Sequence, residues 1–209
     1  MYKKTFLILF CFFLINCESS SYDLVIKNGE VFDGSGTESK TVDIAITGNT
    51  IIKVGKINSE KSTRVIDASG LIVSPGFIDT HAHLDPMDNF IKLSDSESHV
   101  RQGVTTSFGG PDGRGVPLKY GFKQYLDTIE KVGVGMNMGF LTGHNKIRRV
   151  VMNLDNREPT NDELEIMKNL ASKAMDEGAF GISTGLKYLP GNFSKVDEVI
   201  AISKEISNK

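Results

Sequence analysis

Residues 74–85 read SPGFIDTHAHLD, with two histidines, His81 and His83, placed just after a short apolar segment. The apolar segment, residues 76–78, is typical of a buried strand. Side chains at positions i and i+2 of a strand point to the same side, so we expect both imidazoles to project together at the strand's carboxyl end. Histidine nitrogens are common ligands of catalytic zinc. The stretch therefore predicts half of a metal site, with a solvated or structural histidine pair as the alternative.

From Gly76 onward, strand-like and helix-like segments alternate, as a parallel α/β architecture requires. The predicted strands are residues 76–80, 104–108, 134–141 and 179–183. The predicted helices are residues 91–102, residues 118–131 ending at Gly133, one started by a capping box of Thr160 and Glu163, and one capped by Ser194 that runs to Lys209. The last helix has apolar residues at Val196, Val199, Ile200, Ile202 and Ile206. The pattern makes four strand–helix units, which is half of an eight-stranded barrel.

Residues 22–73 predict a small β unit. Residues 24–26 and 31–32 are expected to be separate strands on either side of a turn at Asn28-Gly29. Residues 43–47 and 50–54 flank Gly48-Asn49, which is a two-residue hairpin signal. Residues 65–67 and 71–73 add two short strands.

The first seventeen residues are predicted to be a bacterial export signal. Lys3 and Lys4 precede an apolar run at residues 6–15, which is shorter than the roughly 20 residues of a membrane span. Cys17 closes a sequence typical of a lipoprotein cleavage site, so we expect a lipid on Cys17 and a polar tether at residues 18–21. The protein would then be exported and lipid-anchored to a membrane of the cell envelope. A plain signal peptide or a buried apolar segment is the alternative.

The composition argues against a nucleic-acid partner and against a disulfide bond. The formal net charge is −2, and no cluster of lysine and arginine stands out, so no nucleic-acid partner is predicted. The only cysteines are Cys11, inside the predicted signal, and Cys17. With Cys17 lipidated, the mature protein would carry no disulfide.

Residues 75–85 resemble the signature of the amidohydrolase superfamily. Three further motifs resemble the D-aminoacylase (N-acyl-D-amino-acid deacylase) branch of this superfamily. These motifs are residues 101–106, Gly143-His144 with Arg148, and residues 181–186 with Tyr188, Pro190 and Gly191. The resemblance implies a (β/α)8 barrel, of which residues 74–209 would form the first half. It also implies that residues 22–73 are part of a small β-sandwich with an exposed edge, closed in the family by strands from the far carboxyl terminus. Members of the family are far longer, so this chain is expected to be an amino-terminal fragment.

The resemblance extends the metal site to Asp112. In D-aminoacylases the loop after the second strand carries a cysteine ligand between Asn and Gly, and other members have an aspartate there. Asp112 occupies that position, and zinc accepts aspartate oxygen. The departure from cysteine leaves the number of metal ions and the substrate open. The alternative is an Asp-Gly turn in a surface loop.

Three further residues are expected to bind substrate. His144 follows the third strand and would bind substrate or orient a metal ligand. Arg148, or its neighbour Arg149, could pair with a substrate carboxylate through two hydrogen bonds, and a solvated surface arginine is the alternative. Tyr188 lies in the loop after the fourth strand, and packing within that loop is its alternative role.

The reaction implied by the resemblance is zinc-dependent hydrolysis of an N-acyl-D-amino acid to a carboxylate and a D-amino acid. One or two zinc ions would polarise the amide carbonyl and activate water. The family takes its other zinc histidines from strands five and six and its proton-transfer aspartate from strand eight. No catalytic residue is therefore expected before Lys209, and the polypeptide alone is predicted to be inactive. Two alternatives are an amidohydrolase of cyclic amides or isoaspartyl dipeptides, and a non-catalytic lipid-anchored binding protein with a vestigial site.

Overall fold

The structure is a computed structural model that describes residues 22–59, 62–84, 95–116, 118 and 121–209. The chain divides into two compact units between Pro75 and Gly76, and the predicted boundary lies two residues earlier. The predicted signal, Cys17 and the tether lie outside the described residues. None of the helices in the described part of the chain has the length and apolar character that a membrane span requires.

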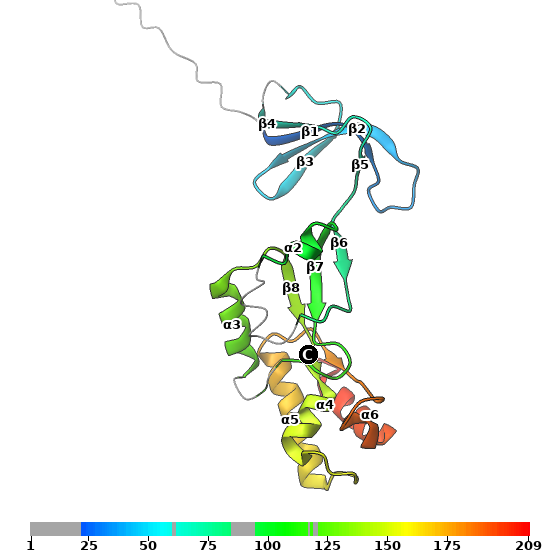
Figure 1. Cartoon of the computed structure of the whole chain (residues 1–209), viewed down its shortest axis with the longest axis vertical. Coiled ribbons are helices and arrows are strands. Elements are labelled where there is room, and N and C mark those ends of the chain that lie inside the picture. Colours follow the sequence, from blue (N-terminus) through cyan, green and yellow to red (C-terminus); the bar gives the residue numbers. More distant parts are fainter. Residues whose placement is uncertain (1–21, 60–61, 85–94, 117, 119–120) are drawn as a thin grey trace, which may run out of the picture. The chain divides into compact units, whose positions relative to one another are not determined.

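The first unit is a five-stranded sheet built around β1 (Figure 1). Its strands are β1 (Tyr22–Val31), β2 (Lys40–Thr47), β3 (Thr50–Gly55), β4 (Ser62–Asp67) and β5 (Ile72–Val73). β1 pairs antiparallel with β2 and parallel with both β4 and β5. The predicted hairpin at Gly48-Asn49 is confirmed, because β2 and β3 pair through Thr47 and Thr50. The buried cluster of this unit is small and consists of Val25, Ala45 and Ile57.

The predicted turn at Asn28-Gly29 is wrong, because β1 continues through it as one strand. The pairing with β2 shifts register between Ile26 and Gly29, which is a bulge. Asn28 takes up a left-handed conformation (φ 59°) there. Its backbone N–H donates to Asp43 (3.0 Å), and its side-chain amide donates to Asp67 (3.1 Å). Carboxylates from the neighbouring strands thus bond the groups of the bulge, so the ladder does not have to end there.

The second unit is a parallel α/β structure. Its strands are β6 (Phe77–Asp79), β7 (Val104–Gly109), β8 (Asn137–Phe140), β9 (Thr142–Gly143) and β10 (Ile182–Ser183). Its helices are α2 (Glu97–Val100), α3 (Phe122–Val132), α4 (His144–Met152), α5 (Asn161–Asp176), the 3₁₀ turn η3 (Gly191–Phe193) and α6 (Val196–Ile206). Parallel pairing runs in the order β6-β7-β8 and between β9 and β10.

Several predicted elements have different bounds. Residues 91–94 of the first predicted helix lie outside the described residues, and the described remainder is only the four-residue α2. Helix α4 was not predicted, because it begins directly after β9 and has no side-chain cap that would signal its start. Ser194 does not cap α6. Lys195 occupies the N-cap position, and the Ser194 hydroxyl donates to the Gly191 carbonyl instead.

Three helices pack together in one buried cluster. The predicted capping box starts α5, with Thr160 and Glu163 bonded to each other's backbone N–H. Met167 and Ala171 of α5 pack against Ile147 of α4 and Ile202 of α6. The predicted apolar face of α6 is only partly correct, because Val196 and Ile200 at its start are exposed.

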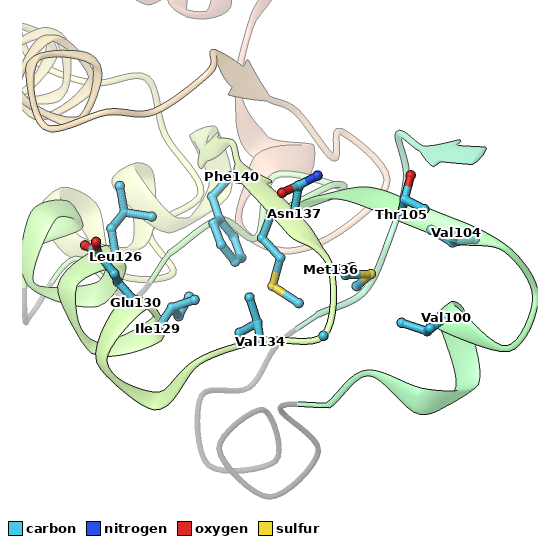
Figure 2. A pocket seen from close by; sticks show the side chains of 12 residues that line it. Val100, Val104, Thr105, Leu126, Ile129, Glu130, Val134, Met136, Asn137 and Phe140 are labelled. Atoms are coloured by element: carbon cyan, nitrogen blue, oxygen red, sulfur yellow. The ribbon is translucent and has the colours of Figure 1, made fainter. Parts of the chain in front are cut away.

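A second buried cluster joins α3 to the strands, and Tyr125 of α3 meets Phe140 of β8 edge to face. Beside it lies a cavity of about 720 Å³ (Figure 2). Val104 and Asn137, at the amino-terminal ends of β7 and β8, line this cavity. Active sites of parallel α/β barrels lie at the opposite, carboxyl-terminal ends of the strands. This cavity therefore lies at the opposite ends of the strands from the ends at which the predicted active site is expected.

Candidate metal centre

His81 and His83 lie in the irregular segment that follows β6. The Asp79 carboxylate accepts a hydrogen bond from the His81 backbone N–H (3.0 Å), which shapes the chain just beyond the strand. Ala82 and Leu84 are buried in the core cluster, whereas both histidines are exposed. The alternation predicted from the sequence thus continues past the end of the strand, and it turns the two imidazoles to the same side.

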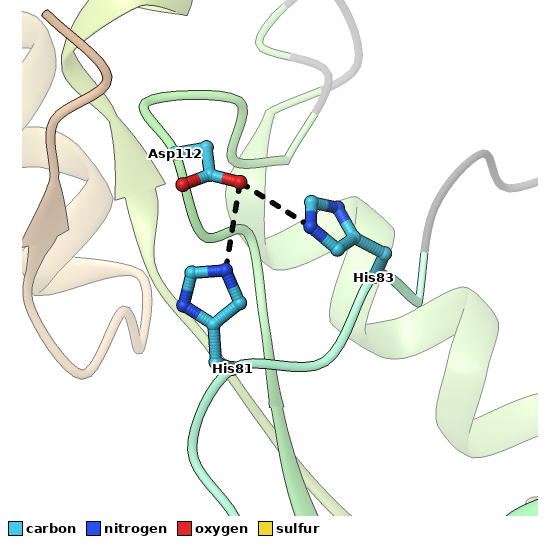
Figure 3. Close-up of side chains that lie close together, drawn as sticks. All are labelled: His81, His83 and Asp112. Atoms are coloured by element: carbon cyan, nitrogen blue, oxygen red, sulfur yellow. Dashed lines mark ion pairs between the residues drawn. The ribbon is translucent and has the colours of Figure 1, made fainter.

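The structure brings Asp112 to these two histidines (Figure 3). Asp112 lies in the loop after β7, about thirty residues along the chain. Its Oδ2 is 3.5 Å from His81 Nε2 and 3.3 Å from His83 Nε2. The three side chains each offer one ligand atom, and all three atoms lie within 4.8 Å of one another.

These separations suit a zinc ion. Zinc bonds to histidine nitrogen and carboxylate oxygen are about 2.0–2.2 Å long, so two ligand atoms at tetrahedral positions stand about 3.3–3.6 Å apart. The separations of Asp112 Oδ2 from the two histidine nitrogens both fall in that range. Two neutral imidazoles and a carboxylate are also borderline and hard ligands of the kind that zinc accepts. The residues present therefore fit the metal.

The loop that carries Asp112 is held from two sides. Asp112 has a left-handed backbone (φ 57°), which aspartate tolerates better than most residues, and Gly113 follows with φ 72°. The Gly113 N–H donates to the Ser183 hydroxyl (3.0 Å), and the Gly113 carbonyl accepts from the Lys146 N–H (3.1 Å). Ser183 also donates to the Gly110 carbonyl (2.6 Å). A strand end and a helix start thus position the carboxylate.

The Asn145 side chain lies between the Asp112 loop and the loop that carries Tyr188. Its buried amide donates to the carbonyls of Gly185 (2.9 Å) and Tyr188 (3.2 Å) and accepts from the Gly185 N–H (3.2 Å). A side chain on Gly113 would overlap the Asn145 amide oxygen. The Asn145 side chain therefore acts as a spacer between the two loops.

The predicted substrate-binding residues His144 and Arg148 do not face an open site. Both side chains are fully buried and hold Glu198 of α6. His144 Nε2 lies 2.8 Å from Glu198 Oε1, and Arg148 bonds Glu198 Oε2 and the Arg157 carbonyl. The Arg148 side chain is completely buried, so a substrate carboxylate cannot reach its guanidinium in this arrangement, and the contacts with Glu198 indicate that it joins α4 to α6.

Tyr188, by contrast, is half-exposed and lies at a cavity of about 330 Å³ that also reaches Asp112. Arg149, the alternative that the sequence left open beside Arg148, lines the same cavity, together with Arg114 and Lys146. Four further residues of this region were not predicted from the sequence: Arg114, Asn145, Lys146 and Glu198. Glu198 could have been found, because it stands four residues before Ile202 on the apolar stripe of α6.

With this geometry established, the comparisons with known proteins assign the family. A model described as the Amidohydrolase family matches residues 64–198, which is more than half of the chain. The chain belongs to the amidohydrolase family. The predicted fold class is confirmed as well: the α/β unit, preceded by a small β unit, matches part of the solved D-aminoacylase chains.

Within the amidohydrolase family, the relatives include several deacylases. The D-aminoacylase of Alcaligenes xylosoxydans xylosoxydans is 31% identical over 210 residues, covering 91% of this chain and 43% of the relative. A solved D-aminoacylase, studied for its binuclear metal centre, shares 30% identity with a TM-score of 0.82, covering 90% of this chain and 43% of that one. N-acyl-D-glutamate deacylase from Bordetella bronchiseptica, solved with zinc and a phosphonate inhibitor, shares 28% identity with a TM-score of 0.81 over the same shares. The chain thus spans less than half the length of the relatives it matches.

Proposed function

We propose that the protein is a zinc-dependent amidohydrolase that hydrolyses the amide bond of N-acyl-D-amino acids. The observation that carries the proposal is the convergence of His81, His83 and Asp112 in a chain whose relatives include D-aminoacylase and N-acyl-D-glutamate deacylase. A zinc ion held there would polarise the amide carbonyl and lower the pKa of an attacking water.

The chain's own residues have separate tasks in this proposal. His81 and His83 would hold the metal through Nε2, and Asp112 would add a carboxylate ligand from the neighbouring loop. Tyr188, at the mouth of the adjoining cavity, would contact the bound substrate. Asp112 would supply a carboxylate oxygen, which is a harder ligand than a cysteine thiolate.

The proposal is tested by metal content and by the chirality of the product. The purified chain, saturated with zinc and dialysed, should retain zinc, and the His81→Ala/His83→Ala and Asp112→Ala variants should lose at least tenfold in zinc affinity. His99→Ala is the matched control, since His99 lies on α2 and takes no part in the cluster.

Activity should be measured on the native protein purified from its own cells, using N-acetyl-D- and N-acetyl-L-amino acids, cyclic amides and β-aspartyl dipeptides. Release of free D-amino acid with a clear preference for the D-series is the expected result. Preference for a cyclic amide or a β-aspartyl dipeptide would assign the protein to another branch of the family. Wild-type zinc content in the His81→Ala/His83→Ala variant would contradict the metal site itself.

We also propose that the protein is exported and carries a lipid on Cys17. The support is the charged start at Lys3 and Lys4, the short apolar run and the position of Cys17. Intact-mass measurement of the native protein should show loss of the first sixteen residues and a lipid-sized increment. Cys17→Ser should keep the protein unlipidated, whereas Cys11→Ser should leave its final mass unchanged, because Cys11 would be removed with the signal.

A further inference from the structure

The cavity beside the candidate metal centre is lined by three cationic side chains. Its volume is about 330 Å³, and Asp112, Gly113 and Arg114 of the β7 loop form one wall. Asn145, Lys146 and Arg149 of α4 form a second wall, and Tyr188 and Leu189 complete the lining. Lys146 and Arg149 are three residues apart, so they lie on the same face of the helix.

In the described part of the second unit, these three cations lack the acidic partners that most of the other cations have. Arg148, between them in sequence, is bonded to Glu198, and Lys123, Arg157 and Lys168 each pair with a carboxylate. Within the described residues, no carboxylate comes within 4.0 Å of the charged groups of Arg114, Lys146 or Arg149. The cavity therefore has an excess of positive charge that an anion entering from solvent would neutralise.

The cavity walls are held in place before any ligand arrives. The Lys146 N–H bonds the Gly113 carbonyl (3.1 Å), which fixes the start of α4 against the Asp112 loop. The buried Asn145 amide bonds Gly185 and the Tyr188 carbonyl, which fixes the third wall. A site whose backbone is already positioned loses less entropy when it binds a ligand.

Asp112 belongs to both the cavity and the metal centre. It lines the cavity, and its carboxylate lies beside His81 and His83 in the metal centre. A small molecule with its amide at the metal would therefore have an adjoining group beside Arg114, Lys146 and Arg149. Carboxylates suit such a site, since each guanidinium can donate two parallel hydrogen bonds to one carboxylate.

We propose that Arg114, Lys146 and Arg149 form a carboxylate-binding subsite that selects anionic substrates at the metal centre. This inference rests on the proposed hydrolysis of N-acyl amino acids. The carboxylate has two sources in such molecules: the α-carboxylate that every N-acyl amino acid carries, or a second carboxylate on an acidic side chain. The chemistry of recognition is the same for both, and the number of carboxylates on the probe separates them.

The test is calorimetric binding of three probes to the zinc-loaded chain: N-acetyl-D-methionine amide, N-acetyl-D-methionine and N-acetyl-D-glutamate, with zero, one and two carboxylates. The Lys146→Gln/Arg149→Gln variant should lose about tenfold or more in affinity for the probes whose carboxylate it binds. Loss for both acids would identify the α-carboxylate, and loss for N-acetyl-D-glutamate alone would identify the side-chain carboxylate. Affinity for the uncharged amide should not change in either case.

The matched control is Arg101→Gln/Lys123→Gln, which removes one positive charge just after α2 and one from α3, both outside the cavity. It should bind all three probes as the wild type does. Equal affinities of the wild-type and Lys146→Gln/Arg149→Gln proteins for every probe would overturn the proposal, as would equal losses in the control.

Different results would contradict the proposed hydrolysis and the proposed carboxylate-binding subsite. If the native enzyme releases no D-amino acid from any probe, the proposed hydrolysis fails, while the binding measurements still decide the subsite. If the native enzyme releases D-amino acid and Lys146→Gln/Arg149→Gln leaves KM unchanged for both acids, the hydrolysis stands and the carboxylate subsite fails.

Discussion

At the scale of single residues, Asp112 occupies a backbone conformation that few residues adopt. Its left-handed φ of 57° directs the carboxylate to His81 and His83, and Gly113 continues the turn with φ 72°. Gly113 is required twice over, because its φ disfavours a side chain and because an added Cβ would overlap Asn145 and the Gly185 backbone. The position of the metal ligand thus depends on a neighbour that has no side chain.

Replacing Gly113 with alanine should destabilise the protein and displace Asp112. We expect a loss of about 1–3 kcal/mol in the free energy of unfolding, from the combined backbone strain and overlap, together with weaker zinc binding. Urea unfolding and zinc titration measure the two effects. Gly133→Ala is the matched control: Gly133 has a similar φ of 77° but nothing within 4 Å of an added Cβ. A Gly113→Ala loss no greater than that of Gly133→Ala would contradict the overlap.

At the scale of elements, α4 and α6 are joined by a buried charged cluster. Glu198 of α6 accepts from His144 and Arg148 of α4, and all three side chains are almost completely removed from solvent. Burial raises the pKa of Glu198, whereas the hydrogen bonds from His144 and Arg148 and the charge of Arg148 lower it. The net result is a pKa below its ordinary value. The cluster therefore holds an ionised glutamate between two helices.

Glu198→Ala should cost about 3–5 kcal/mol in the free energy of unfolding, because it leaves the Arg148 guanidinium buried without its countercharge. Chemical denaturation measures the loss. Asp197→Ala removes an exposed carboxylate from the same turn of α6 and should change stability by less than about 0.5 kcal/mol. Similar losses in the two variants would show that the buried cluster contributes little.

The lowered pKa of Glu198 also predicts a pH dependence. Its stabilising contribution should be complete above its ordinary pKa of 4.5 and should be lost as the pH falls through the lower pKa of the folded state, because the unfolded chain binds the proton first. Urea unfolding between about pH 3 and pH 7 should show wild-type stability falling more steeply in acid than that of Glu198→Gln. The pKa of Glu163 is also lowered, to about 2, by Arg157 and the Thr160 backbone, but that effect is common to both proteins. Parallel curves would mean that Glu198 does not titrate differently on folding.

At the scale of the whole molecule, the candidate metal centre joins two loops that are separate in sequence. His81 and His83 follow β6, and Asp112 follows the neighbouring parallel strand β7. Parallel neighbours end at the same edge of a sheet, so the metal would link their carboxyl-terminal loops. A ligand that binds only the folded state stabilises it by mass action.

Zinc should therefore raise the unfolding temperature of the wild-type chain, with a gain of about 2.7 kcal/mol at a free zinc concentration one hundred times Kd. Thermal unfolding with zinc and with a chelator measures the difference. The His81→Ala/His83→Ala variant should unfold at the same temperature under both conditions. An equal zinc response in that variant would place the stabilising metal elsewhere.

Four features can be predicted from local sequence patterns: the α/β class, the hairpin at Gly48-Asn49, the capping box of α5 and the projection of His81 and His83 to one side. Each of these depends on local chemistry: apolar periodicity, turn residues, a reciprocal hydrogen bond and strand alternation act over a few neighbouring positions. The bulge at Asn28 was misjudged because Asp43 and Asp67, distant in sequence, bond its polar groups.

The contacts of the remaining site residues depend on parts of the chain that are far apart in sequence. His144 and Arg148 were expected to contact substrate, yet Glu198, fifty or more residues away, holds both in the interior. Arg114, Lys146 and Arg149 look like ordinary surface cations in the sequence, and they share one cavity only because α4 begins against the β7 loop. Whether a charge is buried, paired or free depends on which side chains the fold brings within a few ångströms of it, and no local pattern encodes that distance.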